Sequence, residues 1–224
     1  MNNGSTFYRR RGKRLFDIVA SALGLLILCP ALLVLALLVR IFLGSPILFR
    51  QQRSGWNKLP FMIIKFRTMT DARDAAGNLL PDTDRLTRFG KFMRSTSLDE
   101  FPELWNVLKG EMSLVGPRPL QPRYDAYYTE RESLRFELLP GITGWAQING
   151  RNDLIWDERL ECDAWYVERC SLALDLKILC LTIFKVLRRE NVKADPGAVA
   201  FGDLDHERRS RLETPQSATC GEAK

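Results

Sequence analysis

One long apolar run dominates the pattern of hydrophobic and polar positions. Residues 1–14 are polar and then basic, residues 15–43 are almost wholly apolar, and Ile18–Val39 carries no charge. A straight helix over that uncharged stretch is about 33 Å long, enough to cross a bilayer. The pattern therefore predicts a membrane-inserted helix, and the core helix of a soluble protein is the less favoured alternative.

The charges around this run bear on its topology. Basic residues flank both ends, as Arg9–Arg14 before it and as Arg40, Arg50 and Arg53 after it. The positive-inside rule places both flanks in the cytoplasm. We therefore expect a re-entrant hairpin that bends at Cys29-Pro30 and returns, with a single span as the alternative. The run is too long for a cleaved signal peptide, and no small-residue cleavage site follows it.

Alternation and helical spacing predict the elements that follow. Residues 46–67 read as a β-hairpin that turns at Ser54–Asn57, and its end projects Lys65 and Arg67 from one side. A short basic helix is expected over Arg85–Arg94. Further helices are expected within 122–139 and from Asp153 to about Glu168, and Ser171–Leu187 should be an amphipathic helix, either in the membrane interface or in the core.

A short amphipathic helix is expected directly after the basic one. Its apolar stripe is Phe101, Leu104, Trp105 and Leu108, at i, i+3, i+4 and i+7, and Gly110 is a suitable stop. Pro102 is tolerated only in a first turn, which favours Asp99 over Ser97 as the N-cap.

These elements predict a mostly helical α+β fold. It comprises a basic segment (1–14), a re-entrant membrane helix-hairpin (15–43), a small cytoplasmic catalytic domain with a β-hairpin and amphipathic interfacial helices (44–189), and a polar, disordered tail (190–224). No internal repeat is visible.

Composition narrows the class of function. The chain has 224 residues with a formal net charge of +6 and a pI near 9.2, so an anionic partner is expected. Its five cysteines lack C-x-x-C spacing, which favours reduced thiols, and the single histidine, His206, lies in the tail. We therefore expect neither a histidine-based catalytic triad nor a metal site with histidine ligands. The core-like placement of the aromatics argues against nucleic acid.

Candidate chemistry gathers in residues 94–119. Asp99 and Glu100 are adjacent acids; taken alone, they are better explained by stabilisation of a helix N-terminus than by catalysis. Around them lie Arg88, Lys91 and Arg94 upstream and Arg118 downstream, the last held between Pro117 and Pro119. Carboxylates that can attack phosphorus or carry a metal, within a frame of arginines, predict phosphoryl transfer.

The chain resembles a known family over roughly Lys13–Arg189. The motifs are the apolar segment with its central proline, KFRTM at 65–69, the block at 85–119, PGITGWAQINGR at 140–151 and the WxxxLxxDxWYV pattern at 156–167. They resemble the small monotopic polyprenol-phosphate phosphoglycosyl transferases, the bacterial sugar transferase family. One departure is Cys29, where the family often has serine before the proline.

The resemblance implies a Mg²⁺-dependent enzyme on the cytoplasmic face of a bacterial inner membrane. It would transfer sugar-1-phosphate from a UDP-sugar, by analogy an N-acetylated amino sugar, to polyprenol (undecaprenyl) phosphate in the first membrane step of surface glycan assembly, releasing UMP. Asp99 would be the nucleophile of an aspartyl phospho-sugar intermediate and Glu100 the Mg²⁺ ligand. Arg94 and Arg118 would hold phosphate.

Some expectations stay open at this point. Lys65 and Arg151 are further candidates for substrate binding, either by lining the nucleotide pocket or by supporting the loop that does. The alternative to an enzyme is a non-catalytic, membrane-anchored basic module that scaffolds polysaccharide assembly. A homodimer is neither indicated nor excluded by the sequence.

Overall fold

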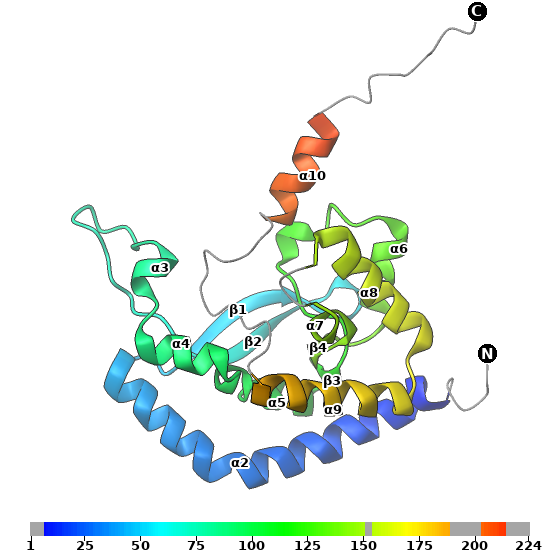
Figure 1. Cartoon of the computed structure of the whole chain (residues 1–224), viewed down its shortest axis with the longest axis horizontal. Helices are drawn as coiled ribbons and strands as arrows, with labels where there is room; N and C mark the ends of the chain where they lie inside the picture. The colour runs from blue at the N-terminus through cyan, green and yellow to red at the C-terminus, as the bar shows by residue number, and fades with distance from the viewer. Residues whose placement is uncertain (1–6, 151–153, 189–202, 214–224) are drawn as a thin grey trace, which may run out of the picture.

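A computed structural model describes residues 7–150, 154–188 and 203–213 of the chain. Figure 1 shows a long bent helix, α2 (Lys13–Leu43), which runs beneath a globular part that contains the later elements. A short π-helical turn, η1 (Tyr8–Gly12), precedes it. The mostly helical α+β fold with one long apolar helix and a β-hairpin is confirmed.

The helix α2 is continuous through Pro30 and bends near its middle (Figure 1). Among the described residues it is the only helix that is long and apolar enough to cross a membrane, judged by length and composition. Its side chains are most exposed close to the bend, where Leu26 and Ile27 are 74% and 73% exposed. Pro30 is thus accommodated within one curved helix, as expected for a residue that bends a helix without ending it.

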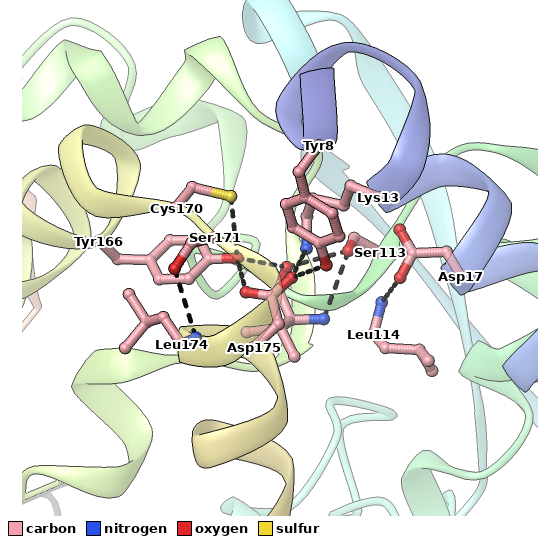
Figure 2. A network of polar contacts seen from close by, with 11 residues as sticks. Tyr8, Lys13, Asp17, Ser113, Leu114, Tyr166, Cys170, Ser171, Leu174 and Asp175 are labelled. Carbon is pink, nitrogen blue, oxygen red and sulfur yellow. Dashed lines mark hydrogen bonds and ion pairs between the residues drawn. The ribbon is translucent and has the colours of Figure 1, made fainter. Parts of the chain in front are cut away.

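The N-terminal end of α2 is held to the globular part by a set of buried polar side chains that we call the anchor network (Figure 2). Both Lys13 Nζ and Tyr8 Oη lie 2.6 Å from Asp175 Oδ2, and Tyr166 Oη donates to Asp175 Oδ1 at 2.6 Å. One turn further along, Asp17 Oδ1 accepts a hydrogen bond from the backbone amide of Leu114. The network comprises Tyr8, Lys13, Tyr166 and Asp175.

The C-terminal end of α2 docks on the same globular part through apolar contacts. Leu35, Val39 and Leu43 form a buried cluster with Phe66 and Met93. Both ends of the helix therefore contact one body, while the bend between them stays exposed.

The predicted β-hairpin is present. Strand β1 (Leu48–Ser54) pairs antiparallel with β2 (Pro60–Phe66), in a register that sets Leu48 opposite Phe66. A 3-10 turn, η2 (Trp56–Lys58), closes it, with Asn57 and Lys58 at positive φ.

A second, parallel pair joins β3 (Ser113–Val115) to β4 (Gly141–Thr143). A Cβ added to Gly141 would lie 2.0 Å from the backbone nitrogen of Gly116, so only glycine permits this approach of the two chains. Gly141 therefore serves the close contact between these two segments of the chain.

Short helices and turns connect these strands and carry most of the surface. They are α3 (Asp82–Arg85), α4 (Arg88–Ser95), η3 (Leu98–Glu100), α5 (Glu103–Lys109), η4 (Pro122–Tyr124), α6 (Glu130–Ser133), η5 (Leu134–Glu137), α7 (Trp145–Ile148), α8 (Trp156–Arg169), α9 (Leu172–Arg188) and α10 (Leu204–Glu213). The helical spacing seen within 122–139 thus resolves into three short turns. One begins with a capping box at Thr129, which starts a new turn inside the stretch.

The two C-terminal helices expected from the sequence are both present. Helix α8 begins at Trp156; the expected cap, Asp153, lies outside the described residues. Helix α9 buries Ile178 in a core cluster with Val115 and Tyr166, yet exposes Ile183 and Leu187. It therefore combines the two roles that the sequence left open, since one face packs on the core and another presents apolar side chains outward.

The tail differs from the expected disordered segment in one place. Residues 204–213 form α10, whose Leu204 is fully buried beside Tyr124 and Trp156. Arg208 pairs with Glu132 at 2.7 Å and with Asp157 at 2.5 Å. One apolar anchor and a few ion pairs are enough to dock a segment whose overall composition is polar, so composition alone misled the prediction.

Candidate active site

A cavity of about 730 Å³ lies between the β-hairpin, the turn that carries the acid pair, and the loops after β3 and β4. Its charged lining residues are Arg53, Lys65, Arg67, Asp71, Asp82, Arg85, Arg94, Asp99, Glu100, Arg118, Arg135, Arg159 and Asp163. The structure therefore brings together Lys65, Arg94, Asp99, Glu100 and Arg118 from distant parts of the chain. Arg151 lies outside the described residues.

Asp99 occupies the 3-10 turn η3 rather than the N-cap of the following helix. Helix α5 begins only at Glu103, with Pro102 in the cap position, so the predicted cap at Asp99 is wrong. Pro102 has no N–H to donate to Leu98, whose carbonyl instead accepts from Phe101 at 3.4 Å. The chain thus stays in a tighter turn, which is entered through Ser97 in the left-handed region at φ 55°.

Five side chains around Asp99 form what we call the acid cluster: Lys65, Asp99, Glu100, Glu103 and Arg118. Lys65 Nζ lies 2.7 Å from Glu100 Oε1 and 2.9 Å from Glu103 Oε1. Arg118 Nη2 donates to the same Glu100 Oε1 at 2.7 Å. Asp99 and Glu100 are each 9% exposed, and Glu103 is 2% exposed.

The acids of this cluster differ in charge state because their neighbours differ. Burial and the charge of Glu100 raise the pKa of Asp99 to about 6. Burial alone would also raise the pKa of Glu100, but Arg118 and Lys65 hold that pKa well below its usual range. Burial raises the pKa of Glu103 to about 7. One carboxylate is therefore firmly ionised, and two titrate near neutral pH.

The cations respond to the same charges. Burial would lower the pKa of Lys65, but Glu100 and Glu103 outweigh it and raise that pKa. Glu100 is also the main cause of the raised pKa of Arg118. The two cations therefore stay charged while they neutralise Glu100.

Arg94 lies on the other wall of the cavity. Its Nε donates to Thr68 Oγ1 at 3.1 Å, which fixes the guanidinium on helix α4 against the segment after β2. The two elements approach closely because residue 90 is glycine; a Cβ there would lie 1.8 Å from the carbonyl oxygen of Thr68. Arg67, expected beside Lys65, instead hydrogen-bonds the carbonyls of Leu43 and Ser45 and so ties the end of α2 to the cavity wall.

Arg135 and Asp163 support the loop that carries Arg118. Arg135 Nη2 donates to the carbonyl oxygen of Arg118 at 2.5 Å and also lies 3.2 Å from Asp163 Oδ2. Burial raises the pKa of Asp163 to about 6. Asp163 is the aspartate of the WxxxLxxDxWYV pattern, so this motif supports the Arg118 loop.

Sequence reasoning missed Glu103, Asp163 and Arg135 as parts of the site. Glu103 follows Glu100 by three positions and offered a local signal, a third acid beside the pair. Arg135 offered none, because its partners are 17 and 28 residues away and nothing local marks it.

The residues present fit a magnesium ion. Both cations contact Glu100 at Oε1, and within the described chain neither contacts Oε2. No group of three or more potential ligands gathers among the described residues. Mg²⁺ commonly takes one or two carboxylates and fills its octahedron with phosphate oxygens and water, and Glu100 offers such a carboxylate beside a cavity.

Comparison with known sequences assigns the chain to a family. Residues 8–189 match the bacterial sugar transferase family, and the chain belongs to it. It is 53% identical over 183 residues to the uncharacterized sugar transferase EpsL of Bacillus subtilis, covering 81% of this chain and 90% of that protein.

Two relatives have more specific names. A UDP-glucose:undecaprenyl-phosphate glucose-1-phosphate transferase of Caulobacter vibrioides is 40% identical, over 80% of this chain and 71% of its own length. A protein of the same name from Klebsiella pneumoniae is 43% identical, over 77% of this chain but only 39% of its own length.

Proposed function

We propose that this protein transfers sugar-1-phosphate from a UDP-sugar to undecaprenyl phosphate and releases UMP. The observation that carries the proposal is the acid cluster: a buried Asp99 whose pKa lies near 6, beside a Glu100 that two cations keep ionised. The names of the Caulobacter and Klebsiella relatives support the same pair of substrates.

Asp99 is the nucleophile of the first step. Its carboxylate oxygen bonds to the sugar-bearing phosphorus, the bond from that phosphorus to the bridging oxygen breaks, and UMP leaves with that oxygen. Arg94 and Arg118, which both line the cavity, hold phosphate oxygens of the attacked group, and Lys65 keeps Glu100 oriented. In the second step a phosphate oxygen of the acceptor attacks the same phosphorus, and the bond to Asp99 breaks.

Glu100 is the proposed protein ligand of Mg²⁺. When bound, the ion would neutralise charge on the diphosphate. Glu100 suits this role because its carboxylate remains ionised throughout the physiological pH range, as the direction of its pKa shift requires.

The covalent step can be tested directly. Detergent-solubilised protein is incubated with Mg²⁺ and a radiolabelled UDP-sugar without acceptor, then digested, and the label is sought on the Asp99 peptide. The expected result is stoichiometric label in the wild type and none in Asp99→Asn. Normal turnover by Asp99→Asn would sink the proposal.

The same assay identifies the sugar of the UDP-sugar donor. The motif analogy favours an N-acetylated amino sugar, whereas the two named relatives act on glucose by name. A panel of UDP-glucose, UDP-galactose, UDP-N-acetylglucosamine and UDP-N-acetylgalactosamine assigns the donor by which one labels Asp99. If Arg88→Glu with Lys91→Glu reduced function while Asp99→Asn did not, the scaffolding alternative would replace the enzyme.

The membrane arrangement that we propose is monotopic on the cytoplasmic face of a bacterial inner membrane. Both ends of α2 contact one globular body, which supports a re-entrant rather than a spanning helix. Single cysteines at Ser5 and Asn57, in a background without native cysteines, should react with a maleimide only from the cytoplasmic side. Labelling from opposite sides would require a single span.

A further inference from the structure

Two arginines of the cavity have no part in the chemistry described so far. Arg53 comes from strand β1 and Arg159 from helix α8, and both line the cavity together with Arg118. Arg118 links them to the rest of the acid cluster, because it contacts Glu100 and its charge also lowers the pKa values of Arg53 and Arg159. The three therefore form one group of positive charge next to the reacting centre.

Neither arginine has a carboxylate partner in the described part of the chain. Arg53 Nη2 donates to Gln51 Oε1 at 2.5 Å, and Arg159 Nη2 donates to the carbonyl oxygen of Leu154 at 3.4 Å. The Nε atoms of both are enclosed and find no acceptor among the described residues. Both side chains are half-buried. An enclosed N–H without an acceptor costs free energy, and an anionic ligand in the cavity would supply the missing acceptor.

The electrostatics support this description. Burial, and next the charge of Arg118, lower the pKa of Arg53 to about 10, and the same two causes lower the pKa of Arg159. Both remain cations at neutral pH and repel Arg118. Arg135 provides the contrast at the same cavity, since Asp163 lies 3.2 Å from it.

Arg159 is also held in place before any ligand arrives. Its guanidinium lies 4.6 Å from the ring centroid of Trp156, which is 7% exposed and packed against Leu160. Stacking of this kind fixes the plane of the guanidinium and leaves its edge free to donate. A rigid, planar pair of N–H donors suits a phosphate group.

We propose that Arg53 and Arg159 form, beside Arg118, an anion subsite for a phosphate other than the one that Asp99 attacks. This rests on the proposed function, in which two such phosphates occur. One is the phosphate of the departing nucleoside monophosphate, and the other is the phosphate of the polyprenol acceptor. Both are tetrahedral phosphate esters, so the same fork of donors recognises either.

The test measures binding by the full chain in detergent, without turnover. UMP and farnesyl phosphate, a short soluble polyprenyl phosphate, are titrated calorimetrically into wild type, Arg53→Gln and Arg159→Gln. The matched control is Arg169→Gln, because Arg169 also lies on α8 and stacks on a tryptophan, Trp165, at 4.8 Å but does not line the cavity.

We expect each cavity variant to lose about tenfold or more in affinity for one of the two probes, as for a charge-assisted hydrogen bond to phosphate. Loss for UMP assigns the subsite to the nucleotide phosphate, and loss for farnesyl phosphate assigns it to the acceptor. Arg169→Gln should bind both probes as the wild type does.

A thermal readout separates this from a structural role. Without ligand, Arg53→Gln and Arg159→Gln should melt at or above the wild-type temperature, because each removes a cation that repels Arg118. Unchanged affinity for both probes, or a wild type that binds neither, would overturn the subsite. Since UMP binding does not require Asp99 to react, absence of label on Asp99 would reject the proposed function and leave this result standing.

Discussion

The anchor network and the acid cluster both bury charged side chains, but they balance their charges in different ways. In the anchor network one carboxylate, Asp175, meets one ammonium, Lys13, and two tyrosine hydroxyls, so each of its oxygens is bound (Figure 2). In the acid cluster Lys65 and Arg118 both contact a single oxygen of Glu100, while Asp99 faces the cavity. The first network is closed, whereas among the described residues the second leaves Asp99 without an ion-pair partner and open to the cavity.

This difference shows how burial alone can be misread. Both clusters contain side chains less than a tenth exposed, and both shift pKa values by desolvation. In the anchor network burial, and next the charge and hydrogen bonds of Asp175, raise the pKa values of Tyr8 and Tyr166 well above their usual range, and both tyrosines stay neutral. In the acid cluster the shifts bring Asp99 and Glu103 to within reach of neutral pH. Charge that is buried and still able to titrate points to chemistry, and charge that is buried and locked points to structure.

The largest expected effect is on activity, from Asp99→Asn. We expect turnover to fall on the order of a thousandfold or more, because the attacking oxygen is replaced by an amide. The melting temperature should not fall, since the change removes a buried carboxylate that Glu100 repels. UMP release and thermal denaturation, measured on the same preparation, check both parts. If Asp99→Asn were inactive because it is unfolded, Asp99 would have a structural role like that of the anchor network, and the contrast between the two clusters would fail.

The corresponding change in the anchor network should act on stability. Asp175→Asn leaves Lys13 as a buried charge without its counter-ion, and we expect a loss of about 3–5 kcal/mol in the free energy of unfolding. Denaturant unfolding of the solubilised protein measures it. Adding Lys13→Met should restore part of the loss; no recovery would mean that the lysine is not the reason for it.

The third expected effect is a pH dependence in the acid cluster. Because burial raises the pKa of Asp99 to about 6, its nucleophilic carboxylate is lost as the pH falls through that value. The rate of the labelling step should fall about tenfold per pH unit below 6 and level off above about 7. The raised pKa also means that ionised Asp99 weakens the fold, so Asp99→Asn should gain most stability above pH 6 and least near pH 4. A rate that stays flat from pH 5 to 8 would contradict this assignment.

The smallest effect is expected at an exposed ion pair, which serves as the baseline for both clusters. Arg131 contacts Glu161 and Glu168 on the surface, with its side chain 48% exposed. Arg131→Gln should change the free energy of unfolding by less than about 1 kcal/mol and leave turnover unchanged. A larger change would show that removing a charge lowers the free energy of unfolding even without burial. The effects of Asp99→Asn and Asp175→Asn on stability would then need to be corrected for it.

Local patterns predicted most of the elements but few of their contacts. The hairpin and the long apolar helix follow from alternation and from an uncharged run, and both are present. The start of α5 was misplaced because a proline in a first turn is compatible with two geometries, and only the lost N–H of Pro102 decides between them. Helix α10 was missed because its docking depends on the single buried Leu204 in a polar stretch.

The site was predictable where its residues are close in sequence. Asp99 and Glu100 were recognisable as a pair with arginines nearby, and the structure places them in a cavity with Arg94 and Arg118. Arg53, Arg135 and Arg159 were not, because each reaches the cavity from a separate strand, turn or helix. Their importance comes from which partners they have or lack, and that is a property of the folded chain.

The two attachments of α2 also bear on how the protein meets a lipid. In the monotopic arrangement proposed above, a helix tethered at both ends would not let the globular part swing away, so the mouth of the cavity would stay at a constant depth. A carrier whose phosphate sits at the headgroup level then needs no out-of-plane excursion to reach it. The encounter becomes a search in two dimensions, and its rate depends on lateral diffusion and on the density of the carrier in the leaflet.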